Sequence, residues 1–172
     1  MVRCLQSTLF FLFLSPALCL GLDLYIMGSM WEPSDTERTF GYGAGVSLPM
    51  ITDYLRLDGR VYFFEENDQD NDESFELIPV DLGLQIHLEP DNDFNPYLLA
   101  GISYMLVDGE QVDIDDDFGG YFGAGLEYGL NKTFRLFGEA QYRIAELGSE
   151  RTLFDDVNVS GFAANFGFKI HL

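Results

Sequence analysis

The chain has few basic residues and few of the side chains on which most enzymes and metal sites depend. Lysine and arginine number 9 against 29 aspartates and glutamates, so the net charge is −20. This balance excludes nucleic acid as a partner, because the phosphate backbone would be repelled. Only two histidines occur, His87 and His171. Serines and carboxylates without a neighbouring base do not form a nucleophile system, so the composition argues against an enzyme.

Cysteine is also scarce, and both copies lie near the N-terminus. Residues 1–21 contain one basic residue, an apolar run and then small residues, which is the layout of a secretory signal peptide. Cleavage after Cys19 and cleavage after Gly21 both fit; a lipoprotein acylated at Cys19 fits less well, because bulky Leu18 precedes the cysteine. Cleavage at either position removes every cysteine, and with it any disulfide or thiolate metal site. We predict that residues 22–172 form the exported domain.

Long apolar runs are absent after residue 21, where no stretch reaches the ~20 apolar residues that a transmembrane helix needs. Even so, 47% of the residues are hydrophobic and 15% are aromatic. Disordered acidic chains lack such an aromatic content. The 18 glycines and 6 prolines favour strands and tight turns, and a length of 172 residues suggests one domain.

From residue 22 onward the chain repeats one unit, an alternating segment of about ten residues followed by a polar break. Period-two alternation is typical of a strand with one apolar and one polar face. An even number of antiparallel strands of ~9–11 residues is typical of a small transmembrane β-barrel. The predicted strands are 22–31, 40–48, 54–64, 77–88, 96–107, 118–130, 133–145 and 162–172. Of these, 96–107 is apolar on both faces, so its orientation stays ambiguous.

The connections between these strands alternate in length and charge. The second, fourth and sixth have seven residues or fewer. The others, 32–39, 65–76, 108–117 and 146–157, contain 3, 7, 6 and 4 acidic residues, which is 20 of the 29. Short periplasmic turns and longer outer loops are expected of such barrels. The last strand is expected to pair with the first, since an open edge in lipid leaves backbone groups unsatisfied.

The polar faces of the strands carry five acidic and five basic residues. A solvated surface has no reason to balance so closely, whereas a narrow lumen does, because an unpaired buried charge is costly. We therefore predict an eight-stranded antiparallel up-and-down barrel with an apolar outer face and an ionic lumen. The predicted lumen charge network is Asp23, Arg56, Asp58, Arg60, Asp81, Glu127, Arg135, Glu139, Arg143 and Lys169.

Three stretches, "NPYLLAGISY", "FGAGLEYGL" and "FGEAQYRI", resemble later strands of the outer-membrane beta-barrel domain family in order and spacing. The chain resembles the small eight-stranded bacterial proteins of this group, such as the OmpA transmembrane domain, OmpX and OmpW. The resemblance implies the outer membrane of a diderm bacterium, surrounding outer-membrane lipid and a monomer without cofactors. It identifies a fold class and leaves the individual function open.

The ending "NFGFKIHL" resembles the C-terminal signal that the barrel-assembly machinery reads. The residues that carry this resemblance are Asn165, Gly167, Ile170 and Leu172. The family usually ends on an aromatic residue, most often Phe, where this chain has Ile and Leu. The resemblance implies the assembly machinery as a partner.

Two acidic loops are candidates for weak divalent-cation binding. Alternate carboxylates are typical of sites for hard cations such as Ca²⁺ and Mg²⁺. The first loop is not an EF-hand, because it lacks the glycine at the sixth position and Pro79 falls at the twelfth. The candidate residues are Asp68, Asp70, Asp72, Asp113, Asp115 and Asp117. Solvated, mutually repulsive loops are the simpler interpretation.

Two functions remain open from the sequence. In the first, the barrel is a non-enzymatic structural or surface-interaction protein with a plugged lumen and acidic outer loops, whose extracellular partner is unknown. In the second, it is a narrow channel for small, hydrophobic solutes, which the resemblance to OmpW-like members implies. Eight strands enclose a space just wide enough for side chains to fill. The apolar face of strand five at Leu99, Met105 and Val107 is compatible with a small apolar pocket and equally with plain packing. A gap in the ionic plug would favour the channel.

Overall fold

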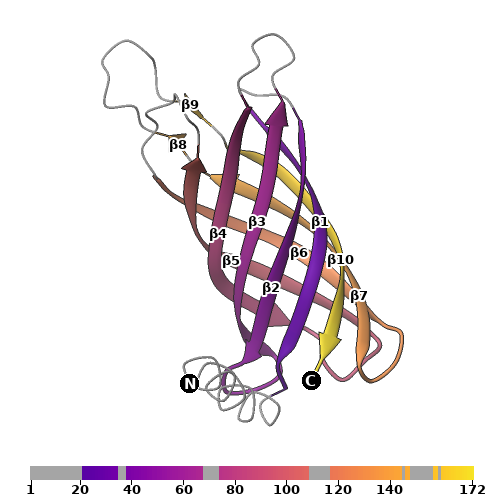
Figure 1. Ribbon diagram of the computed structural model, residues 1–172. Helices are drawn as coiled ribbons and strands as arrows, with labels where there is room; N and C mark the ends of the chain where they lie inside the picture. Colours follow the sequence, from indigo (N-terminus) through magenta and orange to yellow (C-terminus); the bar gives the residue numbers. More distant parts are fainter. Residues whose placement is uncertain are drawn as a thin grey trace, which may run out of the picture.

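Eight strands close into a single antiparallel barrel (Figure 1). The computed structural model describes residues 21–34, 38–67, 74–108, 117–144, 146–147, 157–158 and 160–172. The barrel strands are β1 (Asp23–Pro33), β2 (Thr39–Pro49), β3 (Leu55–Asn67), β4 (Ser74–His87), β5 (Phe94–Asp108), β6 (Asp117–Gly129), β7 (Phe134–Ile144) and β10 (Gly161–His171). The prediction of an eight-stranded up-and-down barrel is confirmed.

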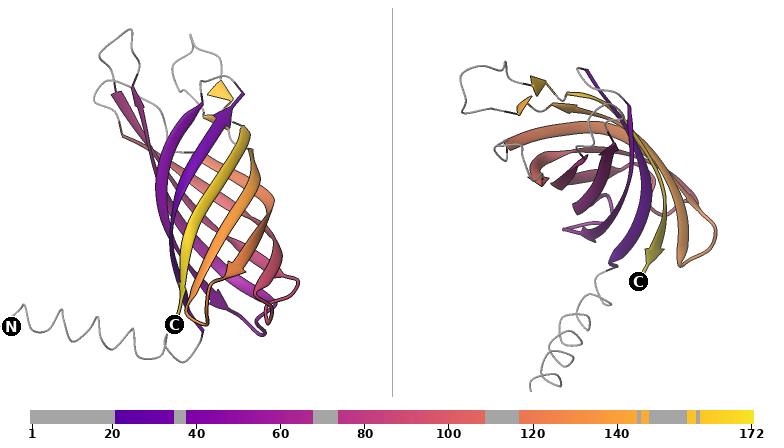
Figure 2. Two further views of the ribbon diagram at one scale, coloured as in Figure 1. Left: turned by 90° about the vertical axis from the view of Figure 1, so that its right-hand side faces the viewer. Right: turned by 45° about the horizontal axis from the view of Figure 1, so that its top comes forward.

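The observed strands differ from the predicted ones mainly at the ends that lead into the long connections. β3, β4 and β5 have 13, 14 and 15 residues, longer than the sequence suggested. Figure 2 shows the β3–β4 hairpin reaching beyond its neighbours. Within the seventh connection, β8 (Glu146–Leu147) pairs with β9 (Val157–Asn158). Strands of two residues are too short for an alternating pattern to reveal them.

The barrel closes between its first and last strands, as predicted. β1 and β10 pair over their full length, from Asp23 opposite His171 to Pro33 opposite Gly161. Both strands also pair with their other neighbours, β2 and β7. Closure satisfies the backbone groups that an open edge would expose to lipid.

Alternation along each strand separates an outer apolar face from a packed interior. Strand five, whose orientation the sequence left ambiguous, shows the rule. Tyr97 is 1% exposed and lies inside, whereas its neighbour Leu98 is 52% exposed and lies outside. Register with the flanking strands decides the orientation, because each inward residue is opposite another inward residue.

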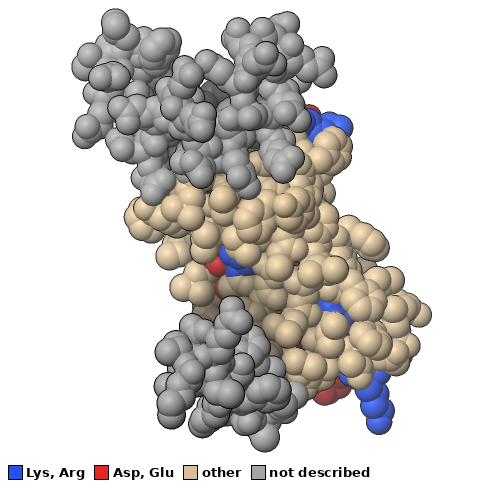
Figure 3. Space-filling model, in the orientation of Figure 1, with Lys and Arg blue, Asp and Glu red and all other residues tan. Residues whose placement is uncertain are grey.

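The outer wall has aromatic residues near both ends, as membrane barrels do at the two interfaces. Phe40, Phe118 and Phe162 lie near the long connections, and Tyr54 and Tyr128 lie near the short turns; all five are exposed. In Figure 3 most of the described wall is neither acidic nor basic. No helix among the described residues is long and apolar enough to cross a membrane.

Candidate functional site: a filled lumen

The centre of the lumen is organised around one guanidinium. Arg60 on β3 is buried and forms ion pairs with Asp58 and, across the barrel, with Glu139 on β7. The Arg60 guanidinium donates two hydrogen bonds to the Glu139 carboxylate, with N–O distances of 2.5 and 3.0 Å. Two carboxylates facing one cation leave a local charge of −1 in this layer.

Neutral donors stabilise the excess negative charge of this central layer. The Tyr25 hydroxyl donates to Asp58 at 2.6 Å, and the Gln85 amide donates to the same oxygen at 2.9 Å. The Tyr97 hydroxyl donates to Glu139 at 2.5 Å, and the Asn165 amide donates to its other oxygen at 3.1 Å. Hydrogen bonds to an ionised acceptor are about twice as strong as neutral ones.

A second layer lies toward the short turns and has the opposite charge excess. It contains two carboxylates, Asp23 and Glu127, and three cations, Arg56, Arg135 and Lys169. Arg56 pairs with Asp23 at 2.9 Å, and Lys169 pairs with Glu127 and, at 3.8 Å, with Asp23. The Lys169 ammonium also lies 5.2 Å from the centre of the Tyr25 ring. The excess of +1 in this layer therefore lies beside the −1 of the central layer.

Arg135 is the least enclosed member of the predicted network. Its side chain is 22% exposed, and its Nη1 atom lies 3.5 Å from Glu127 without forming a hydrogen bond. The other nine residues of the predicted network are buried. Arg135 is at the second position of β7, so it lies at the rim of the barrel.

The third layer combines an ion pair with aromatic rings. Arg143 on β7 donates to both carboxylate oxygens of Asp81 on β4, at 3.1 and 2.6 Å. Its guanidinium lies 4.7 Å from the centre of the Tyr62 ring and 5.6 Å from that of Trp31. Rings at these distances attract a cation through their quadrupole. This layer is electrically neutral.

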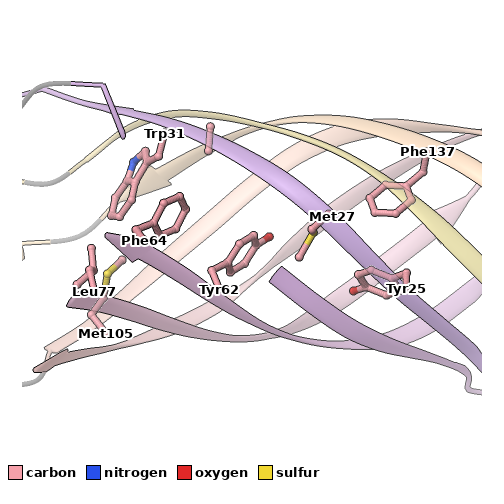
Figure 4. Close-up of a cluster of buried hydrophobic side chains, with 9 residues drawn as sticks. Tyr25, Met27, Trp31, Tyr62, Phe64, Leu77, Met105 and Phe137 are labelled. Atoms are coloured by element: carbon pink, nitrogen blue, oxygen red, sulfur yellow. The ribbon is translucent and has the colours of Figure 1, made fainter. Parts of the chain in front are cut away.

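An apolar layer fills the lumen beyond Arg143, on the side of the long connections. Figure 4 shows Trp31, Phe64, Leu77 and Met105 together near that end of the barrel. All four are buried, and Met105 and Trp31 are completely so. Leu99 is also buried, against Tyr97 and Tyr121. The side chains of strand five thus pack against neighbours and leave no open apolar pocket at Leu99 or Met105; the side chain of Val107 lies outside the described residues.

Two tyrosines reach the central carboxylates because a glycine lies directly opposite each of them. Tyr25 is paired with Gly45 and Tyr97 with Gly125. A Cβ atom on either glycine would lie 2.3 Å from the tyrosine Cζ atom. The rings therefore occupy the space that a side chain would take. This arrangement depends on the register between neighbouring strands, so it is not visible within any single strand of the sequence.

Replacing Gly125 by valine is expected to lower the free energy of unfolding by about 2 kcal/mol, because the added methyls displace the Tyr97 ring from Glu139. Urea unfolding in lipid vesicles, followed by the fluorescence of the single tryptophan, measures the loss. Gly120→Val is the matched control, since a Cβ there meets its nearest atom at an ordinary 3.5 Å. Equal stability of the two variants would contradict the role of Gly125.

The histidines lie at the end of the barrel that carries the short turns. His87 stacks on Tyr97 with ring centres 4.9 Å apart, and its ring nitrogens are within hydrogen-bond distance of Gln85 and Asn95. His171 is 42% exposed at its side chain and contacts Asp23 at 2.6 Å. Both are held as polar members of the lumen or its rim.

The side chains of the acidic cation candidates lie outside the described part of the chain. Asp68, Asp70, Asp72, Asp113 and Asp115 lie outside the described residues. Asp117 begins β6, but its side chain is not among those described. Within the described part of the chain, no group of three or more His, Cys, Asp or Glu residues is arranged to hold a metal ion.

The residues of the predicted assembly signal have structural partners in the barrel. Asn165 accepts a hydrogen bond from Ser29 at 2.7 Å and donates to Glu139. A Cβ atom on Gly167 would lie 2.6 Å from the Phe137 ring. Ile170 is paired with Leu24, and the Leu172 amide donates to the Leu22 carbonyl at 2.8 Å. Their reading by the assembly machinery stays a prediction.

Comparisons with known proteins agree with this architecture. OprG from Pseudomonas aeruginosa superposes with a TM-score of 0.68 and 16% identity, covering 89% of this chain and 97% of that one. Neisserial surface protein A gives 0.68 and 14%, covering 88% and 96%. Outer Membrane Protein W of E. coli gives 0.55 and 14%, covering 89% and 98%. At these identities the likenesses show the fold alone, and no curated protein matches the sequence.

The sequence itself matches the outer membrane protein beta-barrel domain family over residues 20–169. This match covers all eight barrel strands apart from the last two residues of β10. The chain therefore belongs to the outer membrane protein beta-barrel domain family of Gram-negative bacteria.

Proposed function

We propose that this barrel is a closed, non-enzymatic membrane anchor, and that its long acidic connections are the surface through which it acts outside the cell. The filled lumen carries the proposal. Three ionic layers and one apolar layer follow one another along the barrel, and the side chains that cross it are buried. A water-filled path would have to pass both Trp31 and the Arg60–Glu139 pair.

The charge of the connections supports the second half of the proposal. The four segments 32–39, 65–76, 108–117 and 146–157, which comprise the long connections and the strand ends leading into them, carry 20 acidic residues against only two basic ones, Arg38 and Arg151. The ten network charges inside the barrel are balanced, so most of the net charge of −20 belongs to the connections. A dense negative surface attracts cationic partners and repels anionic ones over roughly a Debye length, about 8–10 Å at physiological salt. The partner we propose is therefore a basic surface or polycation.

The alternative, a narrow channel for small hydrophobic solutes, needs an apolar route through the lumen. The two described residues that would line it, Leu99 and Met105, are buried against aromatic neighbours. A hydrophobic solute would then meet the Arg143–Asp81 pair, whose charges are costly to separate. These contacts favour the closed anchor.

Vesicles containing the folded protein test both parts of the proposal, the closed lumen and the acidic surface. We expect the flux of a small polar solute and of a small hydrophobic solute to equal that of protein-free vesicles. We also expect poly-lysine to bind the vesicles, with an affinity that falls steeply with salt. A variant with Asn and Gln in place of the seven acidic residues of 65–76 should bind poly-lysine several-fold more weakly.

The controls make a negative result informative. A heat-sensitive gel band shows that the barrel is folded, and vesicles with an open porin show that flux is detectable. Hydrophobic-solute flux above the protein-free level would establish the channel instead. If the affinity for poly-lysine changes neither with salt nor with the loop substitutions, the proposed acidic surface is overturned.

A further inference from the structure

The outer wall has a recess where β1 meets its two neighbours. Gly28 faces outward in the middle of β1 and lies directly between Tyr42 on β2 and Phe166 on β10. Both aromatic side chains are more than half exposed. A Cβ atom on Gly28 would meet nothing within 4 Å, so open space lies between the two rings.

This recess is part of a larger apolar groove of about 620 Å³. Tyr42 and Phe63, stacked with ring centres 5.5 Å apart, form one side. Phe166 and Phe168 on β10 line the other side, and Gly28 and Ala44 leave the space between them open. The groove therefore has aromatic walls, and its floor is open at Gly28 and Ala44, with Ile26 as the large outward side chain beside them.

The groove is a feature of the outer surface and does not lead into the lumen. Met27, Gly43 and Gly167 also line it, although Met27 is buried inside the barrel. β1 pairs without interruption with β2 and with β10 at this height, so a continuous backbone ladder forms the floor. Met27 and Phe137 are buried behind it.

We propose that this groove, defined by Ile26, Gly28, Tyr42, Ala44, Phe63 and Phe166, is a binding site for a single lipid acyl chain. The groove is continuous with the lipid-facing wall. It lies at the middle of the barrel wall, because Gly28 is the sixth of the eleven residues of β1. At this depth only hydrocarbon reaches the protein, because the lipid headgroups lie at the two ends of the barrel, where the exposed aromatic residues gather. A hydrocarbon chain matches the apolar lining.

Packing, rather than the hydrophobic effect, distinguishes the bound chain from its neighbours in the bilayer. Lipid tails are as apolar as leucine, so burial alone gives no preference for the protein. On the convex wall a chain contacts protein on one side, whereas in the groove it contacts aromatic rings on two sides and the floor on a third. Each added atom pair contributes a small dispersion gain, and their sum favours the groove.

Photo-crosslinking tests this site in vesicles of phosphatidylethanolamine and phosphatidylglycerol that contain the folded full barrel. The probe is a phospholipid with a diazirine near the methyl end of a palmitoyl chain. We expect the adducts, mapped by peptide mass spectrometry, to concentrate on residues 26–28 and 42–44. Gly28→Phe fills the recess and should lower this adduct about tenfold, the change that corresponds to about 1.4 kcal/mol.

Gly59→Phe is the matched control. Gly59 also faces outward, but it lies on β3 outside the groove, and a Cβ there meets only the Val46 side chain, at 3.8 Å. It should leave the adduct at residues 26–28 unchanged. Gly28→Ala, whose methyl meets no neighbour, gives a second groove variant if Gly28→Phe does not fold; it should lower the adduct by a smaller factor.

Two results would overturn the proposal. Adducts spread evenly over the outward side chains, and insensitive to Gly28→Phe, would show that the groove holds no preferred chain. Protein–protein adducts at residues 26–28 in place of lipid adducts would show that a second copy of the barrel occupies the groove.

Discussion

Glu139→Ala is expected to lower the free energy of unfolding by on the order of 3–5 kcal/mol, because it leaves a buried cation without its main partner. Arg60 is completely enclosed and, among the described residues, would retain only Asp58 as an ion-pair partner. The Tyr97 hydroxyl and the Asn165 amide would lose the acceptor that they share. Urea unfolding in lipid vesicles, monitored by tryptophan fluorescence, measures the change.

Two variants separate the loss of charge from other effects. Glu139→Gln keeps the shape and an acceptor oxygen, so its loss should be smaller than that of Glu139→Ala. Arg135→Ala removes a network charge at the rim, where exposed ion pairs contribute less than about 1 kcal/mol. A stability of Glu139→Ala equal to that of Arg135→Ala would contradict the layered charge network.

The second large effect is expected at the Arg143–Asp81 pair, in the layer next to the apolar residues. Arg143→Met alone strands the buried Asp81 carboxylate, which has no other cation within ion-pair distance among the described residues, and should also cost about 3–5 kcal/mol. Combining it with Asp81→Leu removes the stranded charge as well. The double variant should be at least about 2 kcal/mol more stable than Arg143→Met alone, since residues in contact with each other are strongly coupled.

The measurement is a double-mutant cycle of four proteins: the native chain, Arg143→Met, Asp81→Leu and the double variant. The cation also contacts Tyr62 and Trp31, so methionine, which packs well against aromatic rings, is the better replacement. If the loss of stability in the double variant equals the sum of the losses in the two single variants, the pair is not coupled, and the ionic account of this layer is refuted.

The strands were predictable from the sequence because membrane-facing and lumen-facing positions alternate strictly. Asp58 and Arg60, two residues apart, could both be assigned to the interior on this rule alone. The rule gave no orientation for strand five, where Tyr97, Leu99 and Met105 are inward residues that are themselves apolar. There the orientation depends on the register with β4 and β6, which no single segment contains.

The pairing within the lumen could not be read from the sequence. Glu139 is 79 residues from Arg60, and they meet only because β3 and β7 lie across the barrel from each other. The equal numbers of acids and bases predicted a balanced interior and said nothing of its layers. The exposure of Arg135 follows from where β7 begins, and the groove at Gly28 depends on side chains from several strands, so both required the closed barrel.

The ion pairs that cross the lumen have a mechanical consequence. A β-sheet bends easily, so an empty cylinder of eight strands could flatten under lateral pressure from the membrane. Arg60–Glu139, Arg143–Asp81 and Lys169–Glu127 each join strands that are not neighbours, and each acts as an internal strut. Packed interiors are hardly compressible. The cross-section should therefore keep its shape, and the four acidic connections are attached to a rigid base whose anchor points move together.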